Sequence, residues 1–228
     1  MFPLERLPLA ERYAELLATD GVVRGLIGPR EAPRLWDRHL LNCAVLAEPI
    51  PEGATVCDIG SGAGLPGVVL AVARDDLAVT LVEPLLRRTT FLEEVVAELG
   101  LSNVEVIRGR ADALHGSRRF DVVTSRAVAP MGRLLEWSMP LVSKDGALVA
   151  MKGSSVADEI AEAAETLSRL GCAPPEVIEL GGDLLSVPTF AVRVAWSPSA
   201  KVSWRGAPAT PRKRPGRTNY QRPRRPRG

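Results

Sequence analysis

The chain has 228 residues, and 46% of them are hydrophobic, which suits one α/β domain with extensions. No apolar run approaches the ~20 residues of a membrane span, and the first residues lack the basic-then-apolar pattern of a signal peptide, so we expect a cytoplasmic protein. Cys43, Cys57 and Cys172 are far apart and form no C-x-x-C pair, which argues against a disulfide framework and against a zinc site. We expect no bound metal.

The charge is segregated along the chain. Residues 198–228 contain ten Lys or Arg and no acidic residue, so this tail carries +10 and the rest of the chain carries −8. The tail is rich in Pro and Gly and cannot build a core, so we expect it to be disordered. Basic arms of this kind commonly bind nucleic-acid phosphates, although a dispensable solubilising extension is the alternative.

In chain order, the first segment is helical. Apolar residues recur at helical spacing over residues 4–17 and again over residues 35–47. We therefore predict an N-terminal helical extension over residues 1–50. A Rossmann-like domain follows over residues 51–197, and the basic tail completes the chain.

A glycine-rich loop follows the first predicted strand. Residues 54–56 form the strand, residues 68–73 form an apolar helix, and the segment between them contains the pattern D-x-G-x-G-x-G. Gly60, Gly62 and Gly64 lie where the backbone must turn tightly, and without side chains their backbone can touch a ligand. The sequence therefore predicts a cofactor-binding loop, and a glycine-rich turn without a ligand is the alternative.

Two cofactor classes fit this loop. Residues 62–67 match the dinucleotide fingerprint G-x-G-x-x-G, which brings a pyrophosphate to a helix N-terminus. However, the Asp58 carboxylate at the strand end would sit badly beside a pyrophosphate and suits a cationic amino-acid moiety. S-adenosylmethionine, the cofactor of class I methyltransferases, carries an ammonium and a sulfonium and no phosphate, so we favour it.

The next two strands supply further candidate contacts. Glu83 ends a strand 23 residues after Gly60, near the offset of about 20 at which an acidic residue holds a ribose. A third strand over residues 104–108 precedes Ala111 and Asp112, whose backbone and carboxylate could read an adenine edge. Ordinary strand-end and loop chemistry is the alternative for all three residues.

The remaining elements predict the fold class. Helices over residues 86–99, 131–141 and from a Ser155–Asp158 capping pair to about Leu170 alternate with strands over residues 120–124 and 147–151. Two strands, residues 176–180 and 190–196, then follow without a helix between them. We expect a mostly parallel sheet ending in an antiparallel hairpin, the Rossmann-like α/β fold of class I S-adenosylmethionine-dependent methyltransferases. This ending weighs against a dinucleotide-binding protein.

The residues after the fourth strand restrict the methyl acceptor. Exocyclic-amine enzymes carry an Asn/Asp-Pro-Pro-aromatic motif where this chain has residues 124–127, Thr-Ser-Arg-Ala, and no cysteine for cytosine C5 chemistry lies between Cys57 and Cys172. An acceptor such as guanine N7 offers a lone pair without a proton, so positioning can suffice. Arg126 and Lys152 end strands on the ligand side and could orient a guanine, or could be plain surface charges.

Several segments together resemble one family. Residues 36–43 (Trp-Asp-Arg-His-Leu-Leu-Asn-Cys), residues 58–67 with their Leu-Pro-Gly ending, Ser-Arg-Ala at 125–127 and Lys-Gly at 152–153 resemble the RsmG (GidB) family. These are 16S rRNA guanine-N7 methyltransferases that act in the 530 loop. The resemblance runs from about Pro33 to Gly153. Asn42-Cys43 departs from the Asp-Ser of many relatives, and the resemblance does not explain the long basic tail.

The resemblance implies a cofactor, a partner and site residues. It implies S-adenosylmethionine contacts at Gly60, Leu65, Ala111, Asp112 and Arg126, and 16S rRNA or the small ribosomal subunit as the partner, with no obligate protein partner. His39 corresponds to a substrate-side position, although a core histidine is equally consistent with the sequence. The alternatives are a methyltransferase for another RNA or a small molecule, an NAD-dependent oxidoreductase, and a non-catalytic RNA-binding protein.

Overall fold

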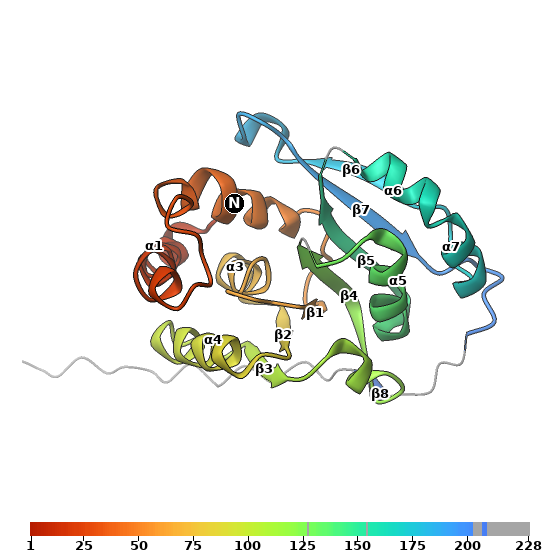
Figure 1. Ribbon diagram of the computed structural model, residues 1–228, viewed down its shortest axis with the longest axis horizontal. Helices are drawn as coiled ribbons and strands as arrows, with labels where there is room; N and C mark the ends of the chain where they lie inside the picture. The colour runs from red at the N-terminus through yellow and green to blue at the C-terminus, as the bar shows by residue number, and fades with distance from the viewer. Residues whose placement is uncertain (127, 154, 203–206, 209–228) are drawn as a thin grey trace, which may run out of the picture.

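The computed structural model describes residues 1–126, 128–153, 155–202 and 207–208, and its centre is a twisted sheet covered by helices on both faces (Figure 1). The strand order is β3-β2-β1-β4-β5-β7-β6, and β8 pairs with the start of β4. Apart from residues 198–202 and 207–208, the predicted tail lies outside the described residues. The strands are β1 (Thr55–Ile59), β2 (Ala78–Glu83), β3 (Val104–Arg108), β4 (Arg118–Arg126), β5 (Val142–Lys152), β6 (Glu176–Leu180), β7 (Thr189–Ala195) and β8 (Ala207–Pro208).

The direction of the strands confirms the predicted fold class. Strands β1 to β5 pair in parallel, whereas β7 is antiparallel to β5 and β6 is antiparallel to β7. The hairpin expected at the end of the sheet is therefore present. The strand order changes direction at β1, which has β2 on one side and β4 on the other, and ligands of open α/β sheets bind at such a switch point.

Helices before and between the strands cover the sheet. Short 3₁₀ and π segments carry the label η. The helical elements are η1 (Leu4–Arg6), α1 (Leu7–Leu16), η2 (Leu17–Gly21), η3 (Ala32–Arg34), η4 (Trp36–Leu40), α2 (Leu41–Ala44), η5 (Val45–Ala47), α3 (Gly67–Ala73), α4 (Leu86–Glu98), η6 (Ala111–Leu114), α5 (Met131–Ser138), η7 (Met139–Leu141), α6 (Val156–Glu162), α7 (Ala164–Leu170) and η8 (Gly182–Leu184). None of them, within the described residues, is long and apolar enough to span a membrane.

Two hydrophobic clusters lie on opposite faces of the sheet. Because side chains alternate along a strand, Val56 packs into one cluster and its neighbour Cys57 into the other. Helices α5, α6 and α7 cover the face that contains Cys57. The opposite face is covered by α3, α4 and the N-terminal helices, and Leu17 and Leu40 are completely buried in it. The N-terminal extension therefore shares a core with the sheet.

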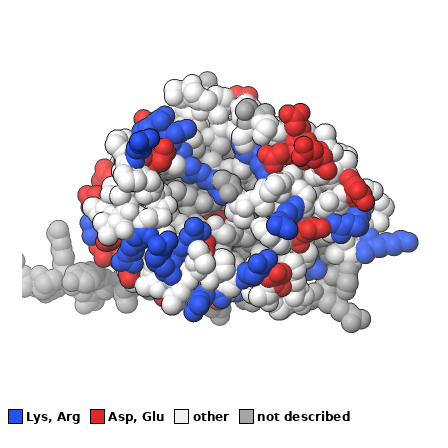
Figure 2. Space-filling view, in the orientation of Figure 1, with Lys and Arg blue, Asp and Glu red and all other residues white. Residues whose placement is uncertain are grey.

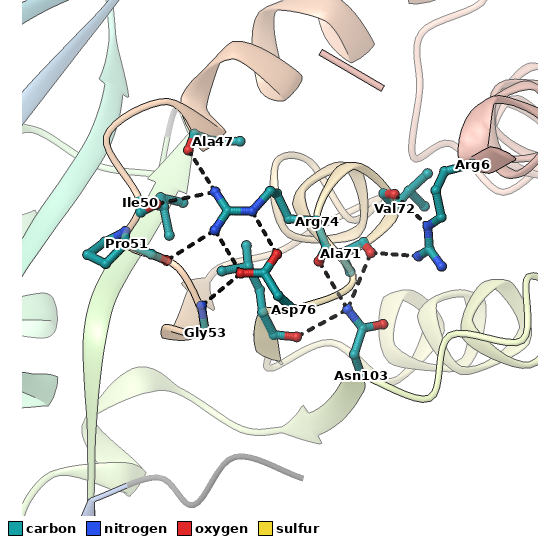
Figure 3. Close-up of polar contacts among 11 residues, drawn as sticks. Arg6, Ala47, Ile50, Pro51, Gly53, Ala71, Val72, Arg74, Asp76 and Asn103 are labelled. Atoms are coloured by element: carbon teal, nitrogen blue, oxygen red, sulfur yellow. Dashed lines mark hydrogen bonds and ion pairs between the residues drawn. The ribbon is translucent and has the colours of Figure 1, made fainter. Parts of the chain in front are cut away.

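Arg74 ties the segment before β1 to the end of α3 (Figure 3). Its Nε donates to Asp76 Oδ1 at 2.7 Å, and Asp76 Oδ2 accepts the Gly53 N–H at 2.7 Å. The other guanidinium nitrogens donate to the backbone carbonyls of Ala47, Ile50 and Pro51. One side chain thus satisfies several carbonyls of the connection between the helical extension and the sheet.

Arg6 makes a second connection between the extension and α3. Its Nε donates to the Val72 carbonyl at 2.9 Å and its Nη2 to the Ala71 carbonyl at 3.0 Å (Figure 3). These carbonyls belong to the last turn of α3, where no intrahelical N–H is available to them. A cation at this end also complements the helix dipole.

The helix expected between Ser155 and Leu170 differs from the prediction. It is divided at Ala163 into α6 and α7, and the Ser155 side chain makes no capping hydrogen bond. Ser155 has φ −81° and ψ 7°, which is not the extended conformation that directs an N-cap side chain to the helix amides. The predicted capping pair with Asp158 is therefore wrong.

Candidate active site

A cavity of about 610 Å³ opens at the carboxyl ends of β1, β2, β3 and β4. Its size is within the range of about 300 to 1,000 Å³ that is usual for small-molecule sites. Figure 2 shows Lys and Arg side chains on several sides of the hollow in this face. The cavity brings together all the residues predicted to bind a cofactor: Gly60, Gly62, Leu65, Glu83, Ala111, Asp112 and Arg126.

The glycine loop needs its glycines for conformation and for space. Gly60, Gly62 and Gly64 have φ values of +67°, +59° and +99°, a region that other residues rarely adopt. A Cβ atom on Gly60 would lie 3.0 Å from Cγ2 of Val128, another residue of the cavity wall. The backbone of the loop therefore forms the floor of the cavity directly.

Asp58 has a different role from the one predicted. Asp58 is not among the described residues that line the cavity. Its side chain is 1% exposed, and Oδ2 accepts the Gly67 N–H at 3.0 Å, at the start of α3. Burial raises the pKa of this carboxyl to about 7, against the opposing effect of that hydrogen bond. Asp58 holds the loop to the helix instead of facing a ligand, so its predicted contact with a cationic moiety is wrong.

Glu83 joins the end of β2 to the glycine loop. Its side chain is 1% exposed, Oε2 accepts the Gly62 N–H at 3.0 Å, and Oε1 accepts the Leu85 N–H at 3.0 Å. Arg88 lies 3.5 Å from Oε2. A carboxylate offers about four acceptor positions, so capacity remains for the hydroxyl groups of a ribose. The position fits the predicted ribose role.

A second cavity, of about 660 Å³, adjoins the first. It is lined by Lys152 and by residues that follow β4 and β5, and it shares Arg126 and Val128 with the first cavity. Lys152 Nζ donates to Glu159 Oε2 at 2.6 Å and to the Ala129 carbonyl at 3.1 Å. Lys152 is thus in the second cavity, and Arg126 lies between the two.

His39 lies in the wall of the first cavity, beside Arg126. Arg126 Nη2 donates to His39 Nδ1, and Arg126 Nη1 lies 3.6 Å from the Cys43 sulfur. His39 Nε2 is 2.9 Å from Glu31 Oε2. Burial and the Arg126 charge lower the pKa of His39 from its usual 6.5. The histidine predicted on the substrate side therefore contacts the arginine that separates the two cavities.

Sequence reasoning missed part of the cavity wall. Leu26 and Ile27 reach it from the N-terminal extension, and Trp137 reaches it from α5. Arg110 lies with its guanidinium carbon 5.9 Å from the centre of the Trp137 ring. Leu26, Ile27 and Trp137 follow no strand end and belong to no local motif, so only the tertiary fold brings them to the site. The described residues contain no cluster of three or more metal-ligating side chains.

Similarity to known proteins decides between the cofactor classes. A family model described as "GidB: rRNA small subunit methyltransferase G" matches residues 6–183. The chain belongs to this family. A ribosomal RNA small subunit methyltransferase G from a Nocardioides species is 70% identical over 216 residues, which cover 95% of this chain and 86% of that protein. The protein of the same description from Thermobifida fusca is 54% identical over 212 residues, which cover 93% of this chain and 90% of that protein.

Membership of the GidB family makes the chain an S-adenosylmethionine-dependent methyltransferase. The NAD-dependent oxidoreductase considered from the G-x-G-x-x-G pattern is therefore wrong. The residues of the first cavity fit S-adenosylmethionine, because the exposed backbone of the glycine loop and the Glu83 carboxylate supply the polar groups such a ligand needs. An acidic group at this strand end suits a ribose, and the fit needs no phosphate-binding group.

Solved structures with the same fold include class I methyltransferases. TYW2 from M. jannaschii, determined in complex with AdoMet, has a TM-score of 0.55 and 17% identity and covers 68% of this chain and 74% of that chain. An S-adenosylmethionine-dependent O-methyltransferase from Thermotoga maritima has a TM-score of 0.54 and 14% identity and covers 72% and 66%. At these identities the similarity shows the fold alone.

Proposed function

We propose that the chain transfers a methyl group from S-adenosylmethionine to N7 of a guanine in the 530 loop of 16S rRNA. The observation that carries this proposal is the position of Arg126, which lines both the cofactor cavity and the cavity that contains Lys152. An arginine commonly pairs with guanine through O6, so this side chain can hold the guanine by O6 and leave the N7 lone pair free to face the bound donor. The relatives named as small-subunit rRNA methyltransferases support the substrate class.

The side chains of the second cavity suit an acceptor that gives up no proton. S-adenosylmethionine supplies a methyl group on a sulfonium sulfur. Guanine N7 attacks with its own lone pair, so no general base is required, and the product ring carries a positive charge. Glu159 and Glu162 in the wall of the second cavity can complement this charge as it develops. Positioning by Arg126 and Lys152 is the remaining requirement.

Unpaired arginines that lie close in sequence to the cavity-lining residues favour RNA over a small-molecule acceptor. Arg30, Arg34, Arg87 and Arg108 form no ion pair within the described residues. They lie within a few residues of the cavity-lining segments of the N-terminal extension, α4 and the end of β3. Phosphate contacts by such side chains supply most of the affinity of a nucleic-acid-binding protein and fix its register.

The proposal is tested on rRNA from cells with and without this protein. Chemical cleavage at 7-methylguanosine should cut 16S rRNA at one position in the 530 loop only when the protein is present. Naked rRNA, assembly intermediates and intact small subunits, each incubated with labelled S-adenosylmethionine, identify the physiological substrate. Label in another RNA or in a small molecule would support the alternative methyltransferases. Cleavage that does not depend on the protein would overturn the proposed site of methylation.

The proposed substrate determines partner and location. The small ribosomal subunit or its rRNA is the partner, and the cytoplasm, where ribosomes assemble, is the proposed location. We propose no obligate protein partner. Gel filtration of the purified chain shows its oligomeric state with and without rRNA. Methyl transfer to rRNA by the purified chain alone would show that no second protein is required.

A further inference from the structure

A chain of hydrogen bonds connects the N-terminal extension to Arg126. Glu31 precedes η3, His39 belongs to η4, and Arg126 ends β4. Glu31 Oε2 is 2.9 Å from His39 Nε2, and His39 Nδ1 accepts a hydrogen bond from Arg126 Nη2. The His39 side chain is 12% exposed and the Glu31 side chain 33%. Of the three residues, Glu31 is outside the described walls of both cavities.

Only one form of His39 satisfies both contacts. A guanidinium only donates hydrogen bonds, so Nδ1 must carry the lone pair that accepts from Arg126. The ring proton is then on Nε2 and is donated to Glu31, whose ionised carboxylate only accepts. His39 is therefore neutral, and burial together with the Arg126 charge lowers its pKa accordingly. The contact with His39 in turn lowers the pKa of Glu31, which keeps the carboxylate ionised.

We propose that Glu31 and His39 are positioning residues, which hold the Arg126 guanidinium in the wall between the two cavities by fixing the His39 tautomer. The proposal rests on the proposed function in one respect, namely that Arg126 contacts the cofactor and the guanine. Glu31 acts only through His39. It selects the tautomer whose Nδ1 faces Arg126.

The arrangement leaves Arg126 both fixed and available. A free arginine side chain loses rotamer entropy when it is ordered. Here His39 and Cys43 occupy one position on each terminal nitrogen before any ligand arrives. A guanidinium has five N–H donors, so three remain for ligands. Prior ordering of this kind removes part of the entropic barrier to reaction.

Two substitutions of His39 distinguish the contact of Nδ1 with Arg126 from the contact of Nε2 with Glu31. An Asn oxygen lies near the position of Nδ1, so His39→Asn keeps an acceptor for Arg126 but cannot reach Glu31. A Gln amide reaches toward Glu31 instead and leaves Arg126 without its acceptor. We expect kcat to fall less than about tenfold in His39→Asn and about a hundredfold in His39→Gln, the size of effect that misplacement of a reacting group produces. The KM for S-adenosylmethionine should change little in His39→Asn.

Glu31→Gln tests the more distant residue. We expect a loss in kcat of about tenfold, because a Gln amide can also donate to Nε2 and so admits the wrong tautomer. In the His39→Asn background the same substitution should have no further effect, since Glu31 acts only through the ring. Glu98→Gln is the matched control, because Glu98 also pairs with an arginine but on the outer surface between α1 and α4.

The pH profile gives a readout that a purely structural role would leave unchanged. The charged groups that face His39 are Arg126, Glu31 and Arg38, and of these only Glu31 raises the pKa of His39. Activity needs the neutral ring, so it falls as pH drops through that pKa, below 6.5. Glu31→Gln removes the carboxylate and should move the acid limb of kcat/KM to lower pH. An unmoved limb would contradict the proposal.

Nitrogen-15 spectra of the imidazole test the tautomer without any acceptor. The chain has only two histidines, so His115→Gln assigns the His39 signals. We expect a protonated Nε2 and an unprotonated Nδ1 at pH 7.5, and a mixture of tautomers in Glu31→Gln. A protonated Nδ1 in the unsubstituted chain would overturn the proposal whatever the enzyme methylates. If the tautomer is as expected and no guanine is methylated, the proposed function fails and the positioning role stands.

Discussion

At the scale of single residues, Glu83 has two tasks that use the same carboxylate. It accepts N–H groups from Gly62 and Leu85, and it lines the cofactor cavity. A substitution therefore affects the loop and the ligand together unless it preserves the shape of the side chain. Glu83→Gln preserves it and Glu83→Ala does not.

We predict that Glu83→Gln weakens S-adenosylhomocysteine binding by about 1 to 2 kcal/mol, because a hydrogen bond to a charged acceptor becomes one to a neutral amide. Glu83→Ala should cost about 3 kcal/mol, since the Gly62 and Leu85 amides also lose their partner. Isothermal titration calorimetry measures both. Glu93→Gln, on the exposed side of α4, is the control. Unchanged affinity in Glu83→Gln would remove Glu83 from the ribose site.

Gly67 is required for space, not for an unusual φ. A Cβ atom there would lie 2.3 Å from Leu81 Cδ2, 2.7 Å from Asp58 Oδ2 and 2.9 Å from Asp58 Cβ. We predict that Gly67→Ala lowers the free energy of unfolding by about 3 kcal/mol, the upper part of the usual range for overpacking. Gly182→Ala, where a Cβ meets no atom within 4 Å, should change it little. Urea denaturation compares the two variants.

Local spacing predicted much of the site, and its failures have physical reasons. Gly60 follows β1 and Glu83 ends the adjacent parallel strand β2, and the ends of such strands must meet at one edge of the sheet. Asp58 also lies near a strand end, but its carboxylate accepts a hydrogen bond from the start of α3, and its sequence position could not reveal this. Trp137 and Ile27 approach from α5 and from the N-terminal extension, far away in sequence.

At the scale of elements, β5 is longer than its apolar pattern predicted. The prediction covered residues 147–151, whereas the strand begins at Val142. The exposed residues Lys144 and Asp145 interrupt the apolar pattern in the first half of the strand, so the sequence does not indicate it. The pairing of β4 with β5 shifts register between Phe120 and Val122, where a Cβ on Gly146 would lie 2.5 Å from the Asp121 carbonyl oxygen. A close backbone approach of this kind leaves no periodic signal.

The connection between the extension and the sheet should depend on pH through Asp76. The Arg74 hydrogen bond lowers the pKa of Asp76 from 3.8 to about 2. A folded-state pKa below the unfolded value gives stability that is present above about pH 4 and lost as pH falls toward 2. We predict that Asp76→Asn lowers the free energy of unfolding by about 2 kcal/mol at pH 7 and by much less at pH 2.

Urea denaturation at both pH values, with Asp145→Asn as the exposed control, measures this contribution. The free energy of unfolding of Asp76→Asn is compared with that of the unsubstituted chain. If the difference stays constant from pH 7 to pH 2, the ion pair is not the cause of the lost stability. Arg74→Lys should reproduce much of the loss, because an ammonium cannot reach the carbonyls that the planar guanidinium contacts.

At the scale of the whole molecule, one hydrophobic cluster extends from the N-terminal helices through α3 to the sheet. The boundary that the sequence suggested near residue 50 therefore does not separate two cores. We predict a single unfolding transition. Variants that keep only Trp36, in the extension, or only Trp196, beyond β7, should give the same urea midpoint by fluorescence. Two separate midpoints would show that the extension unfolds independently.

The basic tail should contribute to RNA affinity through charge alone. Residues 209–228 contain eight Lys or Arg and lie outside the described residues. If half of these cations contact phosphate, their removal should reduce the slope of log affinity against log salt by about 3. Filter binding to 16S rRNA between low and physiological salt measures the slope. An identical slope for the shortened chain would exclude phosphate contacts by the tail.

If Arg126 contacts both donor and RNA, as proposed, each ligand of the enzyme becomes an effector of the other. Because its guanidinium is part of both cavity walls, a ligand in one cavity changes the charge and the free donors offered to the other. Thermodynamics requires that such an influence be reciprocal. The donor loses its sulfonium charge when the methyl group leaves, so the field at Arg126 differs before and after reaction. We therefore expect the affinity for RNA to differ between the donor-bound and the product-bound enzyme.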